Sequence, residues 1–223
     1  MRYTDEQIDL LRAKIGTAMS TRRFEHTLGV EKMAAKIAAI YCPEDETTLR
    51  AAALLHDVTK ELSTGEQIEI FRLHGIKPTK EELDCPATLH SVTAALVIPE
   101  RYPEFADEML INAVKYHTMG RENMTLAEKI IYLADYIDET RTYDDCVALR
   151  NEFFAAKPEK MSKKEQTDHL NRVILHSFEI TIADLTKRGK VISSCTVKAK
   201  NSIISELEKQ LKKERNRYGR DQK

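Results

Sequence analysis

The sequence has little that would direct the protein to a membrane or to nucleic acid. Its longest uncharged apolar stretches, Ala51 to Leu55 and Val92 to Ile98, are far shorter than the ~20 residues of a membrane-spanning helix. Residues Met1 to Glu6 contain no apolar signal-peptide region. The formal net charge is only −1, from 35 basic and 36 acidic residues, so no global field attracts a polyanion. We therefore expect a cytoplasmic protein whose partner is a small molecule, with no nucleic acid and no membrane.

Closely spaced cysteines and strand signals are absent as well. Cys42, Cys85, Cys146 and Cys195 lie far apart, which argues against a zinc knuckle or a disulfide framework, and we interpret them as ordinary thiols. No alternating apolar run, no Asn-Gly hairpin signal and no internal repeat is present. With 223 residues and 42% hydrophobic residues, the chain can fill a sizeable core. The sequence predicts an all-α fold.

Apolar residues at helical spacing and capping signals divide the chain into predicted helices. Residues 1–190 are expected to form the main helical domain, and residues 191–223 a charged helical tail packed on it or extending from it. We expect Asp138 to be exposed. The expected elements are a helix from Thr4 to about Met19, helices over 22–41 and up to about Leu62, a helix capped by Thr64 and stopped at Gly75, a charged connection over 78–84, a turn bracketed by Pro99 and Pro103, a helix opened by the capping box at Thr125, an exposed loop or frayed helix over 151–166, a helix closed by Gly189 and a last helix over 202–217.

One predicted helix ends in a histidine and an aspartate side by side. His56 continues the apolar stripe formed by Leu49, Ala52 and Ala53, and Asp57 is its neighbour. An imidazole and a carboxylate that converge from a helix provide two ligands for a divalent metal, and neither belongs in a dry core without a partner. Lys60, one turn farther on, can meet an anion bound there.

Similar residues recur near the inner faces or ends of other predicted helices. His26 lies on an inward face with Arg23 one turn before it, and Asp135 lies beside the apolar stripe of a later helix. His90 lies at the edge of another stripe, and His117 ends a further one. A histidine alone is more often a hydrogen-bonded core residue, but the recurrence favours a shared site.

The order His26, His56-Asp57, His90, His117, Asp135 resembles that of the HD-domain metal phosphohydrolases. The segments Arg23 to Val30, Ala53 to Lys60, Tyr116 to Gly120 and Tyr132 to Ile137 are similar to the YqeK branch of that superfamily. This resemblance implies an HD-domain helical bundle with a C-terminal helical extension. It also implies symmetrical hydrolysis of diadenosine tetraphosphate to two ADP.

The resemblance implies a role for each matching residue. The metal ligands fall on His26, His56, Asp57 and Asp135, and the metal it implies is iron, although manganese suits the same ligands. The chain departs from the pattern where Ser91 and Ala94 replace glycines and where Asp138-Glu139 replaces Glu-Pro. The nucleotide and phosphate contacts implied by the resemblance include the ligands His26, Asp57 and Asp135 together with Arg23, Lys60, His90, His117 and Arg141.

The resulting hypothesis is hydrolysis by a metal-activated water. Asp57 serves as a ligand and orients the water, and Lys60 neutralises charge on the polyphosphate. His90 and His117 either donate to phosphate or hold a second metal that shares Asp57. The alternatives are an HD phosphohydrolase of another nucleotide (a nucleoside monophosphate, a guanosine polyphosphate or a cyclic dinucleotide), a non-catalytic nucleotide-binding regulatory module, and a purely structural helical protein. The sequence does not determine the oligomeric state, and a homodimer is one candidate.

Overall fold

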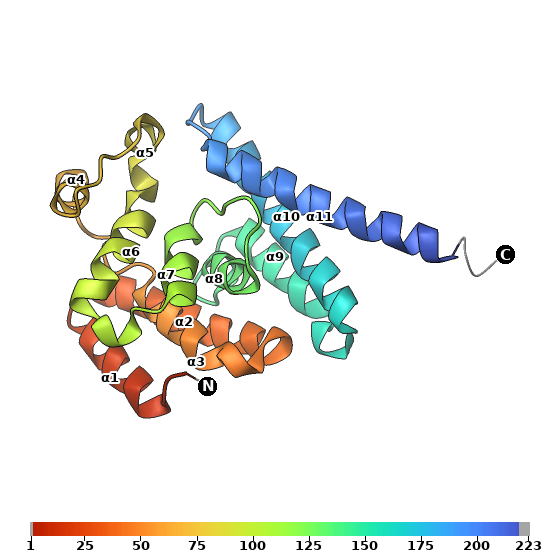
Figure 1. Cartoon of the computed structure of the whole chain (residues 1–223), viewed down its shortest axis with the longest axis horizontal. Helices are drawn as coiled ribbons and strands as arrows, with labels where there is room; N and C mark the ends of the chain where they lie inside the picture. Colours follow the sequence, from red (N-terminus) through yellow and green to blue (C-terminus); the bar gives the residue numbers. More distant parts are fainter. Residues whose placement is uncertain (1, 219–223) are drawn as a thin grey trace.

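Helices and turns make up the part of the chain that the structure describes. The computed structural model describes residues 2–218, with side chains through Lys212, and no strand occurs in this range. The all-α prediction is confirmed (Figure 1). The α-helices are α1 (Asp5–Gly16), α2 (Thr21–Tyr41), α3 (Glu46–Leu55), α4 (Thr64–Leu73), α5 (Lys80–Asp84), α6 (Leu89–Arg101), α7 (Glu108–Tyr116), α8 (Leu126–Ile137), α9 (Asp144–Ala155), α10 (Lys163–Lys187) and α11 (Ser194–Tyr218).

The core lies where α2, α3, α7 and α8 pack on one another. Its side chains are fully buried, among them Ile37 of α2, Leu54 of α3, Val114 of α7 and Leu133 of α8. In Figure 1, α8 is viewed nearly end-on in the middle of the molecule, with α7 and α9 beside it. The C-terminal end of α3 is therefore held inside the bundle, close to α7 and α8.

Capping boxes begin several helices, as local sequence predicts. Thr4 accepts from the Gln7 amide at the start of α1, and Thr125 does the same with Glu128 at α8. Ser63, rather than the expected Thr64, caps α4 together with Glu66. Each box satisfies backbone N–H groups that the first helical turn leaves unpaired.

Two predicted helix ends are wrong, and one of them matters for function. Helix α1 ends at Gly16 rather than near Met19. Helix α3 ends at Leu55 rather than near Leu62, and the following residues form successive tight turns with bonds such as Lys60 N to Asp57 O, 2.9 Å. His56, still in helical conformation, is thus the last residue of the helical spiral, and Asp57 begins the turns that follow it.

Two predicted interruptions are also wrong. Residues 80–84, expected as a connection, form α5 because Thr79 and Glu82 make a capping box. Pro99, expected in a turn, lies inside α6 with its ring exposed to solvent.

The segment 151–166 is not an exposed loop. Helix α9 continues to Ala155 because Leu149 and Phe153 bury one of its faces, and Ser162 then caps α10. Helix α11 begins at Ser194, eight residues before the expected 202, with Ala199 fully buried.

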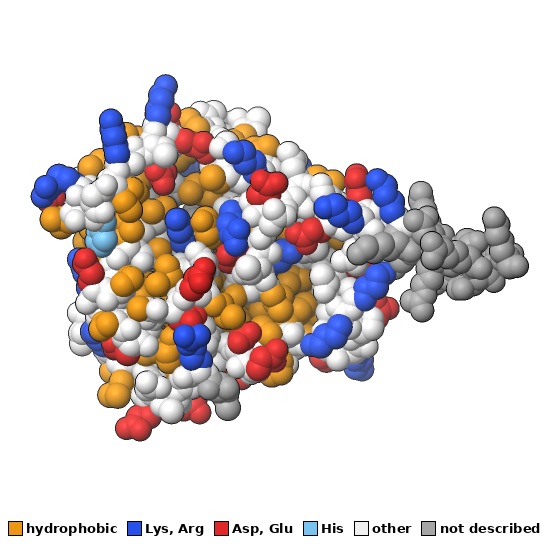
Figure 2. Space-filling model, viewed as in Figure 1, with side chains coloured by type: hydrophobic (Ala, Val, Ile, Leu, Met, Phe, Trp, Pro, Cys, Tyr) orange, Lys and Arg blue, Asp and Glu red, His pale blue; other side chains and the backbone are white. Residues whose placement is uncertain are grey.

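Helices α10 and α11 lie side by side (Figure 1). Glu206 of α11 accepts from Lys129 Nζ at 2.7 Å and from Asn171 Nδ2 at 3.0 Å, and so connects α11 to α8 and α10. Across residues 2–218, no helix is both long and apolar enough to cross a bilayer. Figure 2 shows acidic and basic side chains interspersed over the visible face, as the small net charge predicts.

Candidate metal centre and substrate pocket

His56 is fully buried at the end of α3, and its ring orientation is determined by the backbone. Its Nδ1 lies 2.6 Å from the carbonyl oxygen of Ala53, so Nδ1 carries the proton and donates it there. The other nitrogen, Nε2, has no hydrogen-bond partner and lies 3.4 Å from Asp57 Oδ2 and 3.8 Å from Asp135 Oδ1. An unprotonated, buried ring nitrogen directed at two carboxylates is typical of a metal ligand.

His26 approaches the same point from α2. Its Nε2 lies 3.0 Å from Asp135 Oδ1 and 3.8 Å from Asp57 Oδ2, and it too is buried without a hydrogen-bond partner of good geometry. Burial alone would lower the pKa of His26, but the hydrogen bonds and charges of Asp135 and Asp138 raise it to about 9.

A divalent ion fits the residues that meet here. One nitrogen from each of His26 and His56 and one oxygen of Asp57 lie within 4.8 Å of one another, and His56 also belongs to such a set with His117 and Asp135. Two unpartnered imidazole nitrogens and two carboxylates form a donor set that suits iron or manganese. A bound cation would satisfy both ring nitrogens, which have no hydrogen bond of good geometry to any described residue.

Asp57 lies between two groups of histidines. Its Oδ2 is 2.5 Å from Arg23 NH1, and its Oδ1 is 3.2 Å from His90 Nε2 and 3.7 Å from His117 Nε2. Burial would raise the pKa of Asp57, but the field of His56 and hydrogen bonds from the surrounding histidines hold it well below the usual value. Asp57 is therefore an ionised carboxylate in an almost fully buried place.

The second group of histidines has a different environment. His90, expected at the edge of a stripe, is buried, and its Nε2 lies 3.2 Å from His117 Nε2. Lys60 Nζ lies 3.2 Å from His90 Nδ1, and the Thr118 hydroxyl is 3.1 Å from His117 Nε2. Burial, together with the neighbouring His117 and Lys60, lowers the pKa of His90 to about 4 although Asp57 opposes this. Burial also lowers the pKa of Lys60.

Arg141 pairs with the last predicted ligand. Its NH2 lies 2.6 Å from Asp135 Oδ1, and its Nε donates to the Asp135 carbonyl. Burial would raise the pKa of Asp135, but Arg141 and the histidines His26 and His56 hold it well below the usual value. The structure thus brings every predicted site residue into one connected cluster.

Residues that sequence reasoning missed lie around this cluster. Asp138, predicted to be exposed, is fully buried, and its Oδ2 is 3.3 Å from His26 Nδ1. Thr140 lies beside it, with its hydroxyl 3.5 Å from the same nitrogen. The sequence signal for this contact is Gly29, a glycine in the interior of a predicted helix, where it is less stable than alanine.

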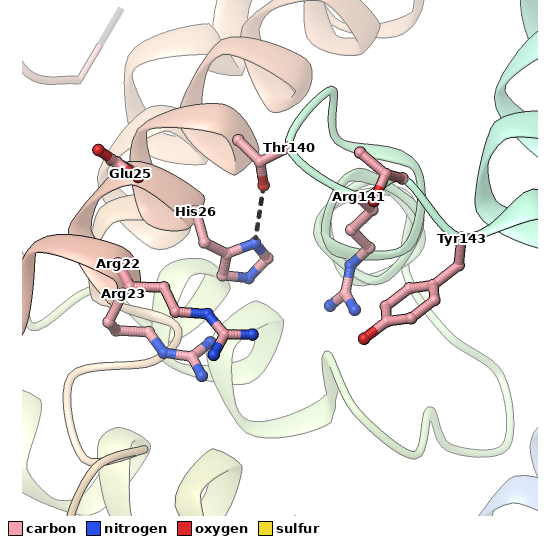
Figure 3. A pocket seen from close by; sticks show the side chains of 8 residues that line it. Arg22, Arg23, Glu25, His26, Thr140, Arg141 and Tyr143 are labelled. Atoms are coloured by element: carbon pink, nitrogen blue, oxygen red, sulfur yellow. Dashed lines mark hydrogen bonds between the residues drawn. The ribbon is translucent and has the colours of Figure 1, made fainter.

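A pocket of about 360 Å³ opens onto the cluster. Figure 3 shows His26 and Arg141 directed into it, the guanidinium groups of Arg22 and Arg23 along one wall, and the ring of Tyr143 on the other. The Tyr143 side chain is 67% exposed, which is unusual for an aromatic ring beside a buried site. The pocket therefore presents three arginines and one open aromatic face.

Comparison with known proteins agrees with this site. The family model described as HD domain matches residues 23–140, and the chain belongs to the HD-domain family. It is 31% identical over 84% of its length, and over 92% of the relative, to a symmetrical bis(5'-nucleosyl)-tetraphosphatase of Halalkalibacterium halodurans. It is 28% identical, with the same coverage, to the protein of that name from Bacillus subtilis.

A solved structure of a related protein has the same fold. The crystal structure of a predicted HD superfamily hydrolase involved in NAD metabolism, from Clostridium acetobutylicum, superposes with a TM-score of 0.77 at 31% identity. The match covers 89% of this chain and 97% of that one. The helical HD-domain architecture predicted from the sequence is confirmed.

Proposed function

We propose that this chain is a metal-dependent phosphohydrolase that cuts diadenosine tetraphosphate symmetrically into two ADP. The observation that carries the proposal is the convergence of His26, His56, Asp57 and Asp135 at one point, with two buried ring nitrogens that make no hydrogen bond of good geometry to any described residue. The names of the curated relatives support the substrate, since two of them are symmetrical bis(5'-nucleosyl)-tetraphosphatases.

In this proposal His26, His56, Asp57 and Asp135 hold the divalent ion, which is iron or manganese. When bound, such an ion polarises a phosphate oxygen and lowers the pKa of a water molecule toward neutrality. Asp57 remains ionised because its pKa is held low, so its carboxylate accepts a hydrogen bond from the attacking water and orients it.

The arginines bind the polyphosphate. Arg23 and Arg141 now neutralise Asp57 and Asp135, at 2.5 and 2.6 Å. Both also line the pocket, so small side-chain rotations present them to phosphate oxygens once the two carboxylates are otherwise engaged. Guanidinium groups suit phosphate because they donate two parallel hydrogen bonds.

His90, His117 and Lys60 form the anion-binding side of the site. A second metal at Asp57, His90 and His117 is geometrically possible, because one atom from each lies within 4.8 Å of the others. Lys60 Nζ lies only 3.2 Å from the His90 ring, however, and the carboxylate within 4 Å of both His90 and His117 is the shared Asp57. A lysine repels a second cation and attracts a phosphate, so we assign these three residues to the leaving ADP.

Arg22 and Tyr143 extend the binding surface outward from the metal centre. Both line the pocket mouth, and neither was singled out from the sequence. An exposed aromatic face stacks on a nucleobase, and every base offers such a face. We assign Tyr143 to one adenine of the substrate and Arg22 to a phosphate of the same half.

The test is a product analysis on the full chain. Protein stripped of metal is supplied with Mn²⁺ and diadenosine tetraphosphate, and the nucleotides are separated by chromatography. ADP as the only product, abolished by chelator, is the expected result. AMP together with ATP contradicts the symmetrical cut, and the absence of turnover contradicts the substrate.

Other nucleotides are tested beside it. A nucleoside monophosphate, a guanosine polyphosphate and a cyclic dinucleotide are supplied under the same conditions. We expect the highest kcat/KM with diadenosine tetraphosphate. A larger kcat/KM for another of these nucleotides would make that nucleotide the substrate and would leave the assignment of the metal ligands unchanged.

A further inference from the structure

Asp138 is a buried aspartate to which the proposed reaction assigns no role. It directly follows α8, and its side chain is fully buried. Its Oδ1 accepts hydrogen bonds from the Thr140 amide (2.8 Å) and from the Thr140 hydroxyl. Arg150 donates to the Asp138 carbonyl at 2.6 Å. These hydrogen bonds fix the turn after α8, and this turn fixes the position of the Asp138 carboxylate.

The second carboxylate oxygen faces His26. Oδ2 is buried, makes no hydrogen bond of good geometry, and lies at ion-pair distance, 3.3 Å, from His26 Nδ1. Arg141 Nε is 3.4 Å away but donates to the Asp135 carbonyl instead. Among the described residues, the His26 ring is thus the nearest polar group to this oxygen.

This arrangement determines which ring nitrogen of His26 keeps a proton. The Thr140 hydroxyl has a single proton and gives it to Asp138 Oδ1, so it offers only lone pairs to Nδ1. Asp138 Oδ2 also offers only lone pairs. With acceptors alone around it, Nδ1 keeps its proton, so Nε2, which faces Asp57 and Asp135, is the nitrogen that would give up its proton to bind a metal ion.

Gly29 makes room for this contact. It lies in α2, one turn after Glu25 and His26, and a Cβ atom there would be 2.7 Å from Asp138 Oδ1 and 2.8 Å from Thr140 Cγ2. Such approaches are too close for any side chain. A glycine costs roughly 1 kcal/mol relative to alanine inside a helix, so its presence in the middle of α2 has a compensating benefit.

We propose that Asp138 is a positioning residue that orients His26 for metal binding, with Thr140 holding the carboxylate and Gly29 admitting it. The inference rests on the proposed function, because His26 is a ligand only in that proposal. Carboxylates that accept from the distal nitrogen of a metal-bound histidine fix its tautomer and ring plane, and their loss typically weakens metal binding about 10- to 100-fold. The ring of His56 is oriented in a comparable way, because its Nδ1 donates to the carbonyl of Ala53.

The experiment measures Mn²⁺ binding to the metal-stripped full chain by calorimetry. Asp138→Asn keeps the shape of the side chain but places an amide donor against either Nδ1 or Thr140. We expect its Mn²⁺ dissociation constant to rise about 10- to 100-fold. The matched control is Glu139→Gln, the same change at the adjacent residue, which is 50% exposed and pairs with Lys32 and Lys36. The Mn²⁺ affinity of Glu139→Gln is expected to equal that of the unaltered chain.

A spectroscopic measurement separates positioning from a general loss of structure. In the Zn²⁺-loaded protein, nitrogen-15 NMR of the histidine rings is expected to show His26 protonated at Nδ1 and coordinated through Nε2. In Asp138→Asn this pattern is expected to be lost for His26 and kept for His56, whose partner is unchanged. Loss at both rings would indicate a general disturbance and would overturn the specific role.

A second variant keeps the test decisive if Asp138→Asn does not fold. Gly29→Ala removes no polar group, but its new methyl group displaces the Asp138 carboxylate. Weaker Mn²⁺ binding in Gly29→Ala supports the inference, and unaltered affinity in all folded variants overturns it. If the unaltered chain binds no Mn²⁺, Fe²⁺ or Zn²⁺, the metal centre itself is wrong, which is a different failure.

Discussion

The two sides of the cluster use the same side chain in opposite electrostatic surroundings. His26 faces Asp135, Asp138 and Asp57, and its pKa rises to about 9. His90 faces His117 and Lys60, and burial lowers its pKa to about 4. Both rings touch Asp57, one through each carboxylate oxygen. The difference shows that neighbouring carboxylates or a neighbouring lysine, and not the ring itself, decide the charge of a buried histidine, although both sides are built from histidines.

The largest expected effect comes from removing the residue that the two sides share. Asp57→Asn keeps the shape but loses the charge, so we expect metal affinity and kcat/KM each to fall by more than about 100-fold, beyond the loss typical of residues outside the coordination sphere. Calorimetry with Mn²⁺ and the product assay measure the two quantities. Full chelator-sensitive turnover in Asp57→Asn would contradict both assignments.

Single changes on either side should separate binding of the metal from binding of phosphate. His26→Ala is expected to weaken Mn²⁺ binding more than tenfold. His90→Ala is expected to lower kcat/KM about 100-fold while leaving Mn²⁺ affinity within about threefold. Calorimetric stoichiometry provides the decisive comparison. If the unaltered chain binds two ions and His90→Ala binds one, the anion assignment is wrong and a second metal takes its place.

The raised pKa of His26 predicts a pH dependence of stability opposite in sign to that of His90, whose lowered pKa costs stability as the pH falls below 6.5. In the metal-free protein the folded-state pKa of His26, about 9, lies above the unfolded value of about 6.5. The stabilisation is therefore fully present below pH 6.5 and is lost as the pH rises through 9, amounting to up to about 3 kcal/mol. Urea unfolding at pH 6 and pH 9.5 measures it.

A comparison of variants isolates this contribution from other titrating groups. His26→Asn is expected to lose most of the pH-dependent difference in unfolding free energy. His176→Gln, an exposed histidine paired with Glu152, serves as the control and is expected to keep it. An unchanged pH dependence in His26→Asn would show that the carboxylates around His26 do not act on it as the distances indicate.

The smallest expected effect lies at the pocket mouth. Tyr143→Ala is expected to raise KM for diadenosine tetraphosphate roughly fivefold with little change in kcat, since stacking on one base contributes about 1 kcal/mol. Tyr143→Phe keeps the ring face and is expected to behave like the unaltered chain. Equal KM values for all three proteins would remove Tyr143 from the substrate site without affecting the metal centre.

Local sequence was a good guide where a helix is determined by its own first turn. The capping boxes at Thr4 and Thr125 are present as predicted. The candidate site residues were also recognisable, because histidines and aspartates beside apolar stripes require partners. Local reasoning failed for residues 151–166, where a lysine-rich composition suggested a loop or a frayed helix but where α9 continues to Ala155. There Phe153 is buried by contacts with other helices, which no local pattern reveals.

Within the candidate site, the burial of Asp138 could likewise not be predicted from local sequence. By itself it resembles an ordinary polar residue at the end of a helix. It is buried because the turn after α8 folds against α2 at the one position, Gly29, that has no side chain. The contact joins residues more than one hundred positions apart, so it depends on how the two helices pack.

The sequence by itself determined that this chain is helical and indicated the side chains that the fold brings together, because periodicity, capping and residue type are local properties. The tertiary structure decided the partner of each ring nitrogen. Helix packing places carboxylates beside His26, a carbonyl beside His56 and a lysine beside His90. Those neighbours determine charge and tautomer, since a pKa depends on burial and on nearby charges, and both arise only when distant segments meet.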